Sequence, residues 1–535
     1  MGAVVKEATE VKALVDEVSA PEIWLTEDQE AVLDQFRSGK SVFFTGSAGT
    51  GKSLLMRRII HECHHVRRMK KCEIAVTAPT AMAAMNIDGF TIHSWAGIGI
   101  GVGSVDKLLK KVLGAAHSED IDPQQGSEES RDRATSPKRR WLECRVLIID
   151  EISMLERSLF DKLEEIARII RHDARPFGGI QLVLSGDFLQ LPPIGRDAKF
   201  VYRSRCWTRC IEKPMVLKTV FRQKELKFVD YLNQLRMGEV TPEALAFFQR
   251  LSRPVTYGDG IRPTELFSTR WEVDVKNAFE LEKLPGRTRT FRSVDSPGRD
   301  PVTDKMLKGD ELTKALERIS APERLELKEG AQVMLLQTLV QNFLVNGSVG
   351  TVISYCTGAA ALASHYVWFG HSSQMCLLAG RGPRTGKAGE RETAEMERLK
   401  LDPHLWPVVR FAVGRSKDRT IDVCCVPLLF TAMHATGGVA AHREQVPLML
   451  SYALTIHKAQ GQTLERVKVD LKRAFTKGQC YVALSRAVSA DALQVLNFDP
   501  EKIKADADVI RWLRGLKHQS ALDETLAFWD DMVEC

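Results

Sequence analysis

Short, continuously apolar runs alternate with helical periods between Pro21 and about Lys213. Such runs are typical of parallel strands that are covered on both faces of a sheet. Between the last two runs, apolar residues recur at helical spacing and predict an amphipathic helix that crosses over the sheet. The pattern therefore predicts an α/β fold. The runs are Ser41–Thr45, Ile74–Thr77, Val146–Ile149 and Ile180–Ser185, and the helical positions are Leu159, Leu163, Ile166 and Ile170.

The pattern shifts toward shorter strands between Gly330 and Val446, and this region predicts a small β-rich domain. Asn346-Gly347 lies between two of its apolar runs, and this dipeptide is a strong signal for a hairpin turn. The predicted strands are Val333–Leu336, Thr351–Tyr355, Val408–Phe411 and Ile421–Leu429.

Two segments carry too few large apolar residues to form a core. His117–Arg140 is polar and contains proline, so we expect a mobile insertion there. Ala379–Arg391 is rich in glycine and basic residues, so we expect a surface loop. Residues 1–20 place acidic side chains among valines and alanines, and they predict a short solvent-facing helix or arm.

The composition indicates a folded soluble protein but does not identify its partner. Hydrophobic residues make up 44% and charged residues 27%, which is typical of a folded soluble chain. Lysine and arginine total 75 against 69 acidic residues, a net charge of +6 that permits a nucleic-acid partner without requiring one. Apolar runs fall short of the ~20 residues that span a bilayer, so we expect no membrane association. The 11 cysteines show no C-x-x-C spacing, which favours reduced thiols over zinc ligands or disulfides.

A glycine-rich loop between an apolar strand and a helical stretch is the strongest chemical signal in the chain. It fits G-x-x-x-x-G-K-S and has the strand before it and the helix after it that a phosphate-binding loop requires. The backbone N–H groups of such a loop surround a phosphate, Lys52 reaches the β and γ phosphates, and Ser53 binds magnesium. These residues predict an ATP and Mg²⁺ site. The loop consists of Gly46, Ser47, Ala48, Gly49, Thr50, Gly51, Lys52 and Ser53.

Polar side chains at the ends of two other strands predict hydrolysis at this site. Asp150 and Glu151 directly follow Val146–Ile149. Asp150 is placed to hold the magnesium ion, and Glu151 to orient a water for in-line attack on the γ-phosphate. Gln190, in the loop after Ile180–Ser185, is placed to contact the γ-phosphate; the alternative is a loop amide that bonds to backbone.

Several blocks of the sequence together resemble the PIF (petite integration frequency) DNA helicases, a family of superfamily-one motor proteins that move 5′ to 3′. The resemblance extends from about Leu25 to Phe498, and the block PFGGIQLVLSGDF at Pro176–Phe188 is specific to this family. The blocks are Thr77–Gly101, Ile148–Leu155, Arg157–Pro193, Thr219–Gln223, Leu344–Gly350, Thr455–Thr463 and Gly478–Ala487.

The resemblance implies roles for residues outside the local motifs. Gln29 matches the glutamine that reads the adenine edge. Arg222 and Arg486 match arginines that reach the γ-phosphate from a second motor domain, although either residue alone would more often form a surface salt bridge. Other positions match residues that contact the backbone of single-stranded DNA or relay the nucleotide state to it: Thr80, His93, His457 and Lys458.

Two aromatic residues in these blocks leave two interpretations open. Trp95 and Tyr481 have the aromatic faces on which bases of single-stranded DNA stack. Packing in a core is the alternative for each. We therefore treat Tyr481 as a candidate DNA contact that requires a test.

The resemblance also implies a division into two RecA-like motor domains with small inserted domains, one of them β-rich and SH3-like. A strand-separating wedge is expected near the polar insertion. The predicted units are an arm at 1–20, a first motor domain at 21–213 with the wedge and mobile loop at about 97–140, a second motor domain at 214–352 and 446–535, and the β-rich domain at 353–445.

These features predict an ATP-dependent DNA helicase that uses Mg²⁺ and acts as a monomer on single-stranded and forked DNA. The resemblance implies a role in genome maintenance, including quadruplex unwinding and telomere upkeep, in the nucleus or the mitochondrion. Basic clusters at Arg67–Lys71 and Pro137–Arg140 fit nuclear import or, alternatively, solvated surfaces. The alternative functions are a translocase that strips proteins from DNA, an RNA helicase, and a nucleic-acid-binding scaffold with a decayed ATPase.

Overall fold

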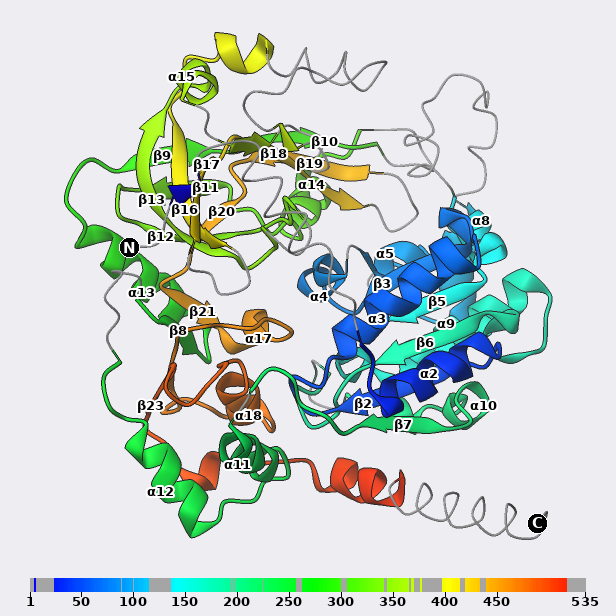
Figure 1. Ribbon diagram of the computed structural model, residues 1–535. Coiled ribbons are helices and arrows are strands. Elements are labelled where there is room, and N and C mark those ends of the chain that lie inside the picture. Colours follow the sequence, from blue (N-terminus) through cyan, green and yellow to red (C-terminus); the bar gives the residue numbers. More distant parts are fainter. Residues whose placement is uncertain are drawn as a thin grey trace.

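The computed structural model contains two α/β domains and a β-rich region (Figure 1). The first α/β domain lies on the right of the view, the second at the lower left, and the β-rich region above the second. The structure describes residues 4–5, 24–87, 89–99, 101–114, 136–193, 195, 198–223, 225–255, 262–299, 306–340, 344–364, 367–369, 376–377, 397–413, 419–433 and 439–516.

The first α/β domain is built on a parallel sheet of six strands, in the order β4-β3-β5-β6-β2-β7. All four predicted runs form strands of this sheet. β7 pairs with β2, so the domain extends beyond residue 213. The predicted boundary at residue 213 is therefore wrong. The strands are β2 (Val42–Gly46), β3 (Ile74–Ala78), β4 (Phe90–Thr91), β5 (Val146–Ile149), β6 (Gln181–Ser185) and β7 (Pro214–Leu217). The helices are α2 (Glu27–Arg37), α3 (Lys52–His61), α4 (Ala81–Asn86), α5 (Ile92–Ala96), α6 (Val105–Gly114), α8 (Pro137–Glu143), α9 (Arg157–Arg171) and α10 (Trp207–Cys210).

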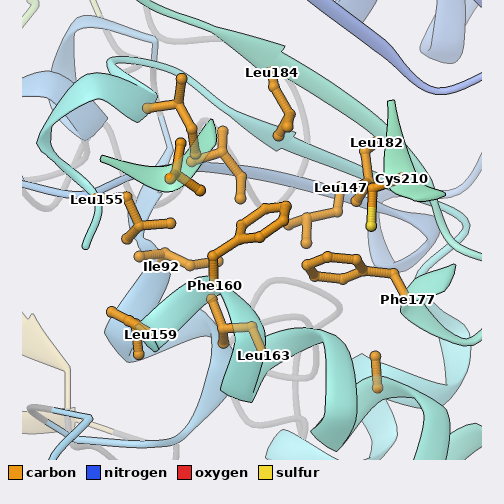
Figure 2. Close-up of a cluster of buried hydrophobic side chains, with 14 of the residues drawn as sticks. Ile92, Leu147, Leu155, Leu159, Phe160, Leu163, Phe177, Leu182, Leu184 and Cys210 are labelled. Carbon is orange, nitrogen blue, oxygen red and sulfur yellow. The ribbon is translucent and has the colours of Figure 1, made fainter. Parts of the chain in front are cut away.

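Helix α9 supplies much of the core of this domain. The four apolar positions that predicted it are all buried, which confirms the amphipathic crossover helix. Phe160 of α9 packs against Phe177, with 5.0 Å between ring centroids, over Leu147 of the sheet (Figure 2). This packing covers one face of the sheet at β5 and β6, whose following loops carry the polar residues.

The last described segment of the chain returns to the first α/β domain. Residues 507–516 form a helix, and its Val509 and Leu513 are buried in the core of the first domain. Trp512 stacks on Tyr202 at 4.5 Å between ring centroids. The assignment of all of 446–535 to the second domain is therefore wrong. The few apolar residues of one short helix do not indicate which core the helix joins.

The second α/β domain has a parallel sheet of four strands, in the order β21-β8-β22-β23. Figure 1 shows α17 and α18 on the side of this domain that faces the first domain. The strands are β8 (Thr264–Phe267), β21 (Ala453–Thr455), β22 (Val467–Asp470) and β23 (Leu493–Leu496). The helices are α11 (Leu226–Arg236), α12 (Pro242–Arg250), α13 (Arg270–Glu282), α17 (Ile456–Ala459) and α18 (Gln479–Leu484).

The β-rich region begins well before the predicted residue 353. β12 and β13 lie within its eight-stranded sheet, and β10 joins β19 and β18 in a separate sheet of three strands. Pairing between strands distant in sequence sets this boundary, so no local pattern reveals it. The strands are β1 (Val4–Val5), β9 (Arg289–Arg292), β10 (Val294–Pro297), β11 (Arg324–Leu327), β12 (Gln332–Leu335), β13 (Val349–Cys356), β14 (Val367–Phe369), β15 (Cys376–Leu377), β16 (Trp406–Val413), β17 (Arg419–Cys424), β18 (Leu428–Met433), β19 (Val439–Gln445) and β20 (Leu448–Leu450), with helices α14 (Gly309–Leu316) and α15 (Gly358–Ala363).

Two details of this region differ from the prediction. The single run Ile421–Leu429 is divided between β17 and β18, which belong to different sheets. β12 and β13 are antiparallel, and the connection between them, which contains the turn predicted at Asn346-Gly347, is longer than that turn alone. Gly347 still makes a turn with φ of +94°, and its N–H donates to the carbonyl of Leu335 at 2.9 Å.

Other segments also depart from the prediction. Val4–Val5 of the expected arm forms β1, which pairs with β17. Pro137–Arg140 belongs to α8, because Ser136 caps the helix and Pro137 fits its first turn. Residues 117–135 and 379–391 lie outside the described part of the chain.

The cysteines lie mostly in the cores of the described regions. These thiols are free, and most of them are buried. Across the described ranges, no group of three His, Cys, Asp or Glu side chains is arranged to hold a metal ion. In the same ranges, no helix is both long and apolar enough to cross a bilayer.

Candidate functional site

The glycine-rich loop leaves β2 and enters α3 in the conformation that its sequence predicts. Gly49 and Gly51 have φ of +87° and +77°, in the left-handed region that favours glycine. A β-carbon at Gly51 would lie 2.7 Å from the amide nitrogen of Gln29. The Lys52 ammonium folds over the loop and donates to the carbonyls of Gly46 and Ser47, at 2.8 and 3.0 Å. The loop is therefore closely packed around its own lysine.

Gln29 joins α2 to this loop. Its Nε2 donates to the carbonyl of Thr50 at 3.2 Å, and its Oε1 accepts from the Thr26 N–H at 3.1 Å. Phe221 lies on the other side of Gly51, with ring carbons 3.4 Å from where a β-carbon would be, and its side chain is half exposed. An isolated phenylalanine carries no signal in a sequence, so only the structure identifies this neighbour.

Asp150 and Glu151 follow β5 and belong to the same site. Burial and the neighbouring Glu151 raise the pKa of the Asp150 carboxyl to about 6. The nearby Lys52 opposes this shift only in part. The Ser53 hydroxyl and the Asp150 carboxylate are hard oxygen donors of the kind that Mg²⁺ prefers, so the residues present fit the ion.

Three cations gather here without carboxylate partners. Lys52, Arg222 and Arg486 form no ion pair with any carboxylate of the described residues. Burial lowers the pKa of Lys52 and of Arg486, and burial together with Arg486 lowers the pKa of Arg222 to about 9. Uncompensated buried cations are costly, and an anion that reached all three would relieve the cost. The site has the electrostatics of a polyanion-binding site.

The two arginines are held by α18 and by Ser485, which directly follows it. The Arg222 guanidinium donates to the carbonyl of Ser485 at 3.0 Å. The fully buried Arg486 donates to the carbonyl of Val482 at 2.8 Å and to the Ser485 hydroxyl at 3.0 Å. Both side chains therefore lie at the boundary between the two α/β domains.

Tyr481 does not belong to a surface on which DNA bases stack. Its side chain is buried, and its hydroxyl accepts a hydrogen bond from the N–H of Ala48 at 2.7 Å. Burial raises the pKa of the phenol to about 12. The interpretation of Tyr481 as a DNA contact is wrong, because α18 directs the ring toward the glycine-rich loop of the first α/β domain.

A buried ion pair that the sequence did not indicate also joins the two domains. Arg236 of α11 forms a two-pronged pair with Asp187, at 2.9 and 2.7 Å. Burial alone would raise the pKa of Asp187, but the charge and hydrogen bonds of Arg236 reverse the effect and hold that pKa below its ordinary value. Gln190 donates to the same carboxylate at 3.4 Å, while its Oε1 is buried without a described partner. A carboxylate that follows a glycine in a loop gives no sign of a partner so distant in sequence.

We expect Asp187→Asn to lower the free energy of unfolding by about 3 kcal/mol, because removal of one partner leaves a buried, unpaired guanidinium. Urea denaturation measures the change. Asp508→Asn is the matched control, since its pair with Arg203 is largely exposed and should contribute less than about 1 kcal/mol. Equal losses in the two variants would contradict a special role for the buried pair.

The candidate DNA contacts occupy several elements. Thr80 caps α4 by accepting from the Ala83 N–H at 3.2 Å, and His93 lies on α5. His457 and Lys458 are exposed on α17. Trp95 is instead buried, with its ring 4.6 Å from that of Trp141, so core packing is the correct interpretation.

Comparisons with known proteins agree with this arrangement. Residues 24–244 match the family model of the PIF1-like helicases, and residues 314–355 match the model of the DNA helicase Pif1 2B domain. The second match starts before residue 353, as do the strands of the β-rich region.

Individual relatives match most of the chain. The ATP-dependent DNA helicase PIF1 of Emericella nidulans is 42% identical over 90% of this chain and 62% of its own length. The ATP-dependent DNA helicase RRM3 of Saccharomyces cerevisiae is 40% identical over 92% of this chain and 68% of its own length. The crystal structure of the Candida albicans Pif1 helicase is 39% identical, with a TM-score of 0.73, and the match covers 92% of this chain and 100% of that one.

The chain thus spans about three fifths of the Emericella relative and the whole of the Candida crystal structure. With identity near 40% in both the RRM3 relative and the crystal structure, the chain belongs to the PIF1-like helicase family.

Proposed function

We propose that this chain is an ATP-dependent DNA helicase, as its relatives are named, and that it moves 5′ to 3′ along single-stranded DNA. One observation carries the proposal: the hydrolytic groups of one α/β domain meet groups from the boundary with the other domain. The glycine-rich loop and the Asp150-Glu151 pair lie on one side, and Arg222 and Tyr481 lie on the other. A nucleotide bound at such a boundary changes the contact between two domains as it is hydrolysed. That coupling is what a motor requires.

The residues divide the hydrolytic work between them. Lys52, Arg222 and Arg486 offset the charge of the triphosphate. Ser53 and Asp150 would hold Mg²⁺, which would supply further positive charge against the phosphates. Gln29 and Phe221 flank a position suited to the adenine base. Glu151 accepts a proton from the attacking water as the water oxygen bonds to the γ-phosphorus. The bond from that phosphorus to its bridging oxygen breaks, and ADP leaves.

We further propose that single-stranded DNA crosses both domains. Thr80 and His93 would contact its backbone from the first domain, and His457 and Lys458 from the second. Hydroxyls, imidazoles and ammonium groups suit phosphate contacts that do not read the sequence. Alternating grip by the two domains then converts each turnover into movement along the strand.

The biological setting follows the family. We propose that the chain acts as a monomer in genome maintenance, in the nucleus or the mitochondrion. Fluorescent tagging of the full-length protein distinguishes the two compartments.

A strand-displacement assay tests the proposed function. Forked duplexes with a single 5′ or 3′ tail are incubated with ATP, Mg²⁺ and either the protein or its Lys52→Ala variant. We expect displacement only from the 5′-tailed substrate and only by the unmodified protein. Equal displacement by Lys52→Ala would overturn the proposal.

The assay also separates the alternatives. A translocase without strand separation would show DNA-stimulated ATPase activity and no displaced strand. An RNA helicase would prefer the matched RNA substrate. A scaffold with a decayed ATPase would bind DNA without hydrolysing ATP.

A further inference from the structure

Gln460 of the second α/β domain contacts the proposed general base of the first. Its Nε2 donates to Glu151 Oε2 at 3.0 Å, and its side chain is 6% exposed. A carboxylate accepts hydrogen bonds and does not donate them, so the amide nitrogen must be the atom that faces Glu151. The contact joins the general base to the opposite domain.

The backbone conformations at Glu151 and at Gly461 allow the two segments to approach each other closely. Glu151 itself has φ of +49°, a left-handed conformation that is uncommon outside glycine. Gly461 has φ of +80°, and a β-carbon there would lie 3.0 Å from the Asn86 amide nitrogen and 3.7 Å from Glu151 Oε1. The segment 460–461 therefore lies close to both oxygens of the carboxylate.

The second polar atom of the amide is unsatisfied. Gln460 Oε1 is buried and has no hydrogen-bond partner among the described residues. A buried acceptor without a partner costs free energy unless a donor occupies the site when the protein is active. A water molecule beside Glu151 would provide that donor.

Gln460 is also joined to the proposed DNA contacts. It directly follows α17, which carries His457 and Lys458, and its N–H donates to the carbonyl of His457 at 3.3 Å. A displacement of α17 by DNA therefore moves Gln460 relative to Glu151.

We propose that Gln460 is a positioning residue, supplied by the second domain, that holds the Glu151 carboxylate and its water for attack and transmits the state of α17 to hydrolysis. The proposal rests on the proposed function. It extends the hydrolytic site to a residue whose side chain acts through Glu151. Among the described residues, this side chain forms no hydrogen bond with the glycine-rich loop or with the two arginines.

Gln460→Met tests the proposal, because methionine keeps the length and volume of the side chain and removes both polar atoms. We expect DNA-stimulated kcat to fall about tenfold, as for the loss of a hydrogen bond to a charged group, while KM for ATP changes less than about twofold. Gln462→Met is the matched control: that side chain is similarly buried, at 8% exposed, in the same segment, and it makes no contact with Glu151. We expect it to keep kcat within about twofold.

A double-mutant cycle with Glu151→Gln supplies a readout that a purely structural role would not change. If Gln460 acts through Glu151, Gln460→Met should alter the residual kcat of Glu151→Gln by less than about twofold. Multiplicative losses, a raised KM with unchanged kcat, or an equal loss in Gln462→Met would each overturn the inference. Absence of ATPase activity in the unmodified protein would instead refute the proposed function.

Discussion

Arg222→Ala is expected to lower kcat for ATP hydrolysis by about 10³-fold or more, with a smaller effect on nucleotide binding. A planar guanidinium at the γ-phosphate neutralises charge that develops in the transition state. Arg222 is suited to this task because its side chain lies against the glycine-rich loop at Gly49 and forms no ion pair with a carboxylate of the described residues. Burial and the nearby Arg486 lower its pKa to about 9, which is the cost that a bound anion would relieve. Steady-state ATPase kinetics with saturating single-stranded DNA measure the change.

Two further variants serve as controls for the Arg222→Ala result. Arg222→Lys keeps the charge but loses the fork of donors, so we expect its kcat to lie between those of the protein and the alanine variant. Arg511→Ala removes an exposed guanidinium from the C-terminal helix and should leave kcat unchanged. A thermal unfolding curve for each variant excludes misfolding. If Arg222→Ala hydrolyses ATP as fast as the unmodified protein, Arg222 does not contact the transition state.

Glu151→Gln is expected to lower kcat by about 10²–10⁴-fold while ATP still binds. The substitution removes the base that accepts the proton of the attacking water and preserves the size of the side chain. The amide oxygen of the new residue can still accept from Gln460, so the local structure should persist. Single-turnover hydrolysis gives the rate, and binding of a fluorescent ATP analogue gives the affinity.

Glu165→Gln provides the comparison for this second prediction. Glu165 is exposed on α9, in the same domain, and the change in charge is the same. It should have no measurable effect on kcat. Wild-type hydrolysis by Glu151→Gln would require another residue, or the phosphate itself, to receive the proton.

The sequence predicts the parts of the site that lie within continuous motifs. A phosphate loop needs glycines and a lysine at fixed spacing, so Gly46–Ser53 is identifiable without a structure. Asp150 and Glu151 are identifiable for the same reason, because they end an apolar strand. The sequence does not predict the direction in which a side chain points. Tyr481 matched the DNA-contact interpretation as well as any aromatic residue, and only the placement of α18 against Ala48 reveals its position.

Domain boundaries were harder to predict because pairing over long distances decides them. β7 follows the predicted end of the first domain, yet among the described strands it pairs with β2, which precedes it by most of that domain. β10 likewise joins β19 across more than a hundred residues of chain. The partners Gln460 and Arg236 escaped prediction for the same reason, since each meets its carboxylate across the boundary between domains.

The return of residues 507–516 to the first α/β domain has a mechanical consequence. The chain crosses between the lobes twice, once after β7 and once after Ile503, whose side chain is still in the second core. We expect these two connections to restrict twisting and sliding of one α/β domain against the other more than a change in the angle between the domains.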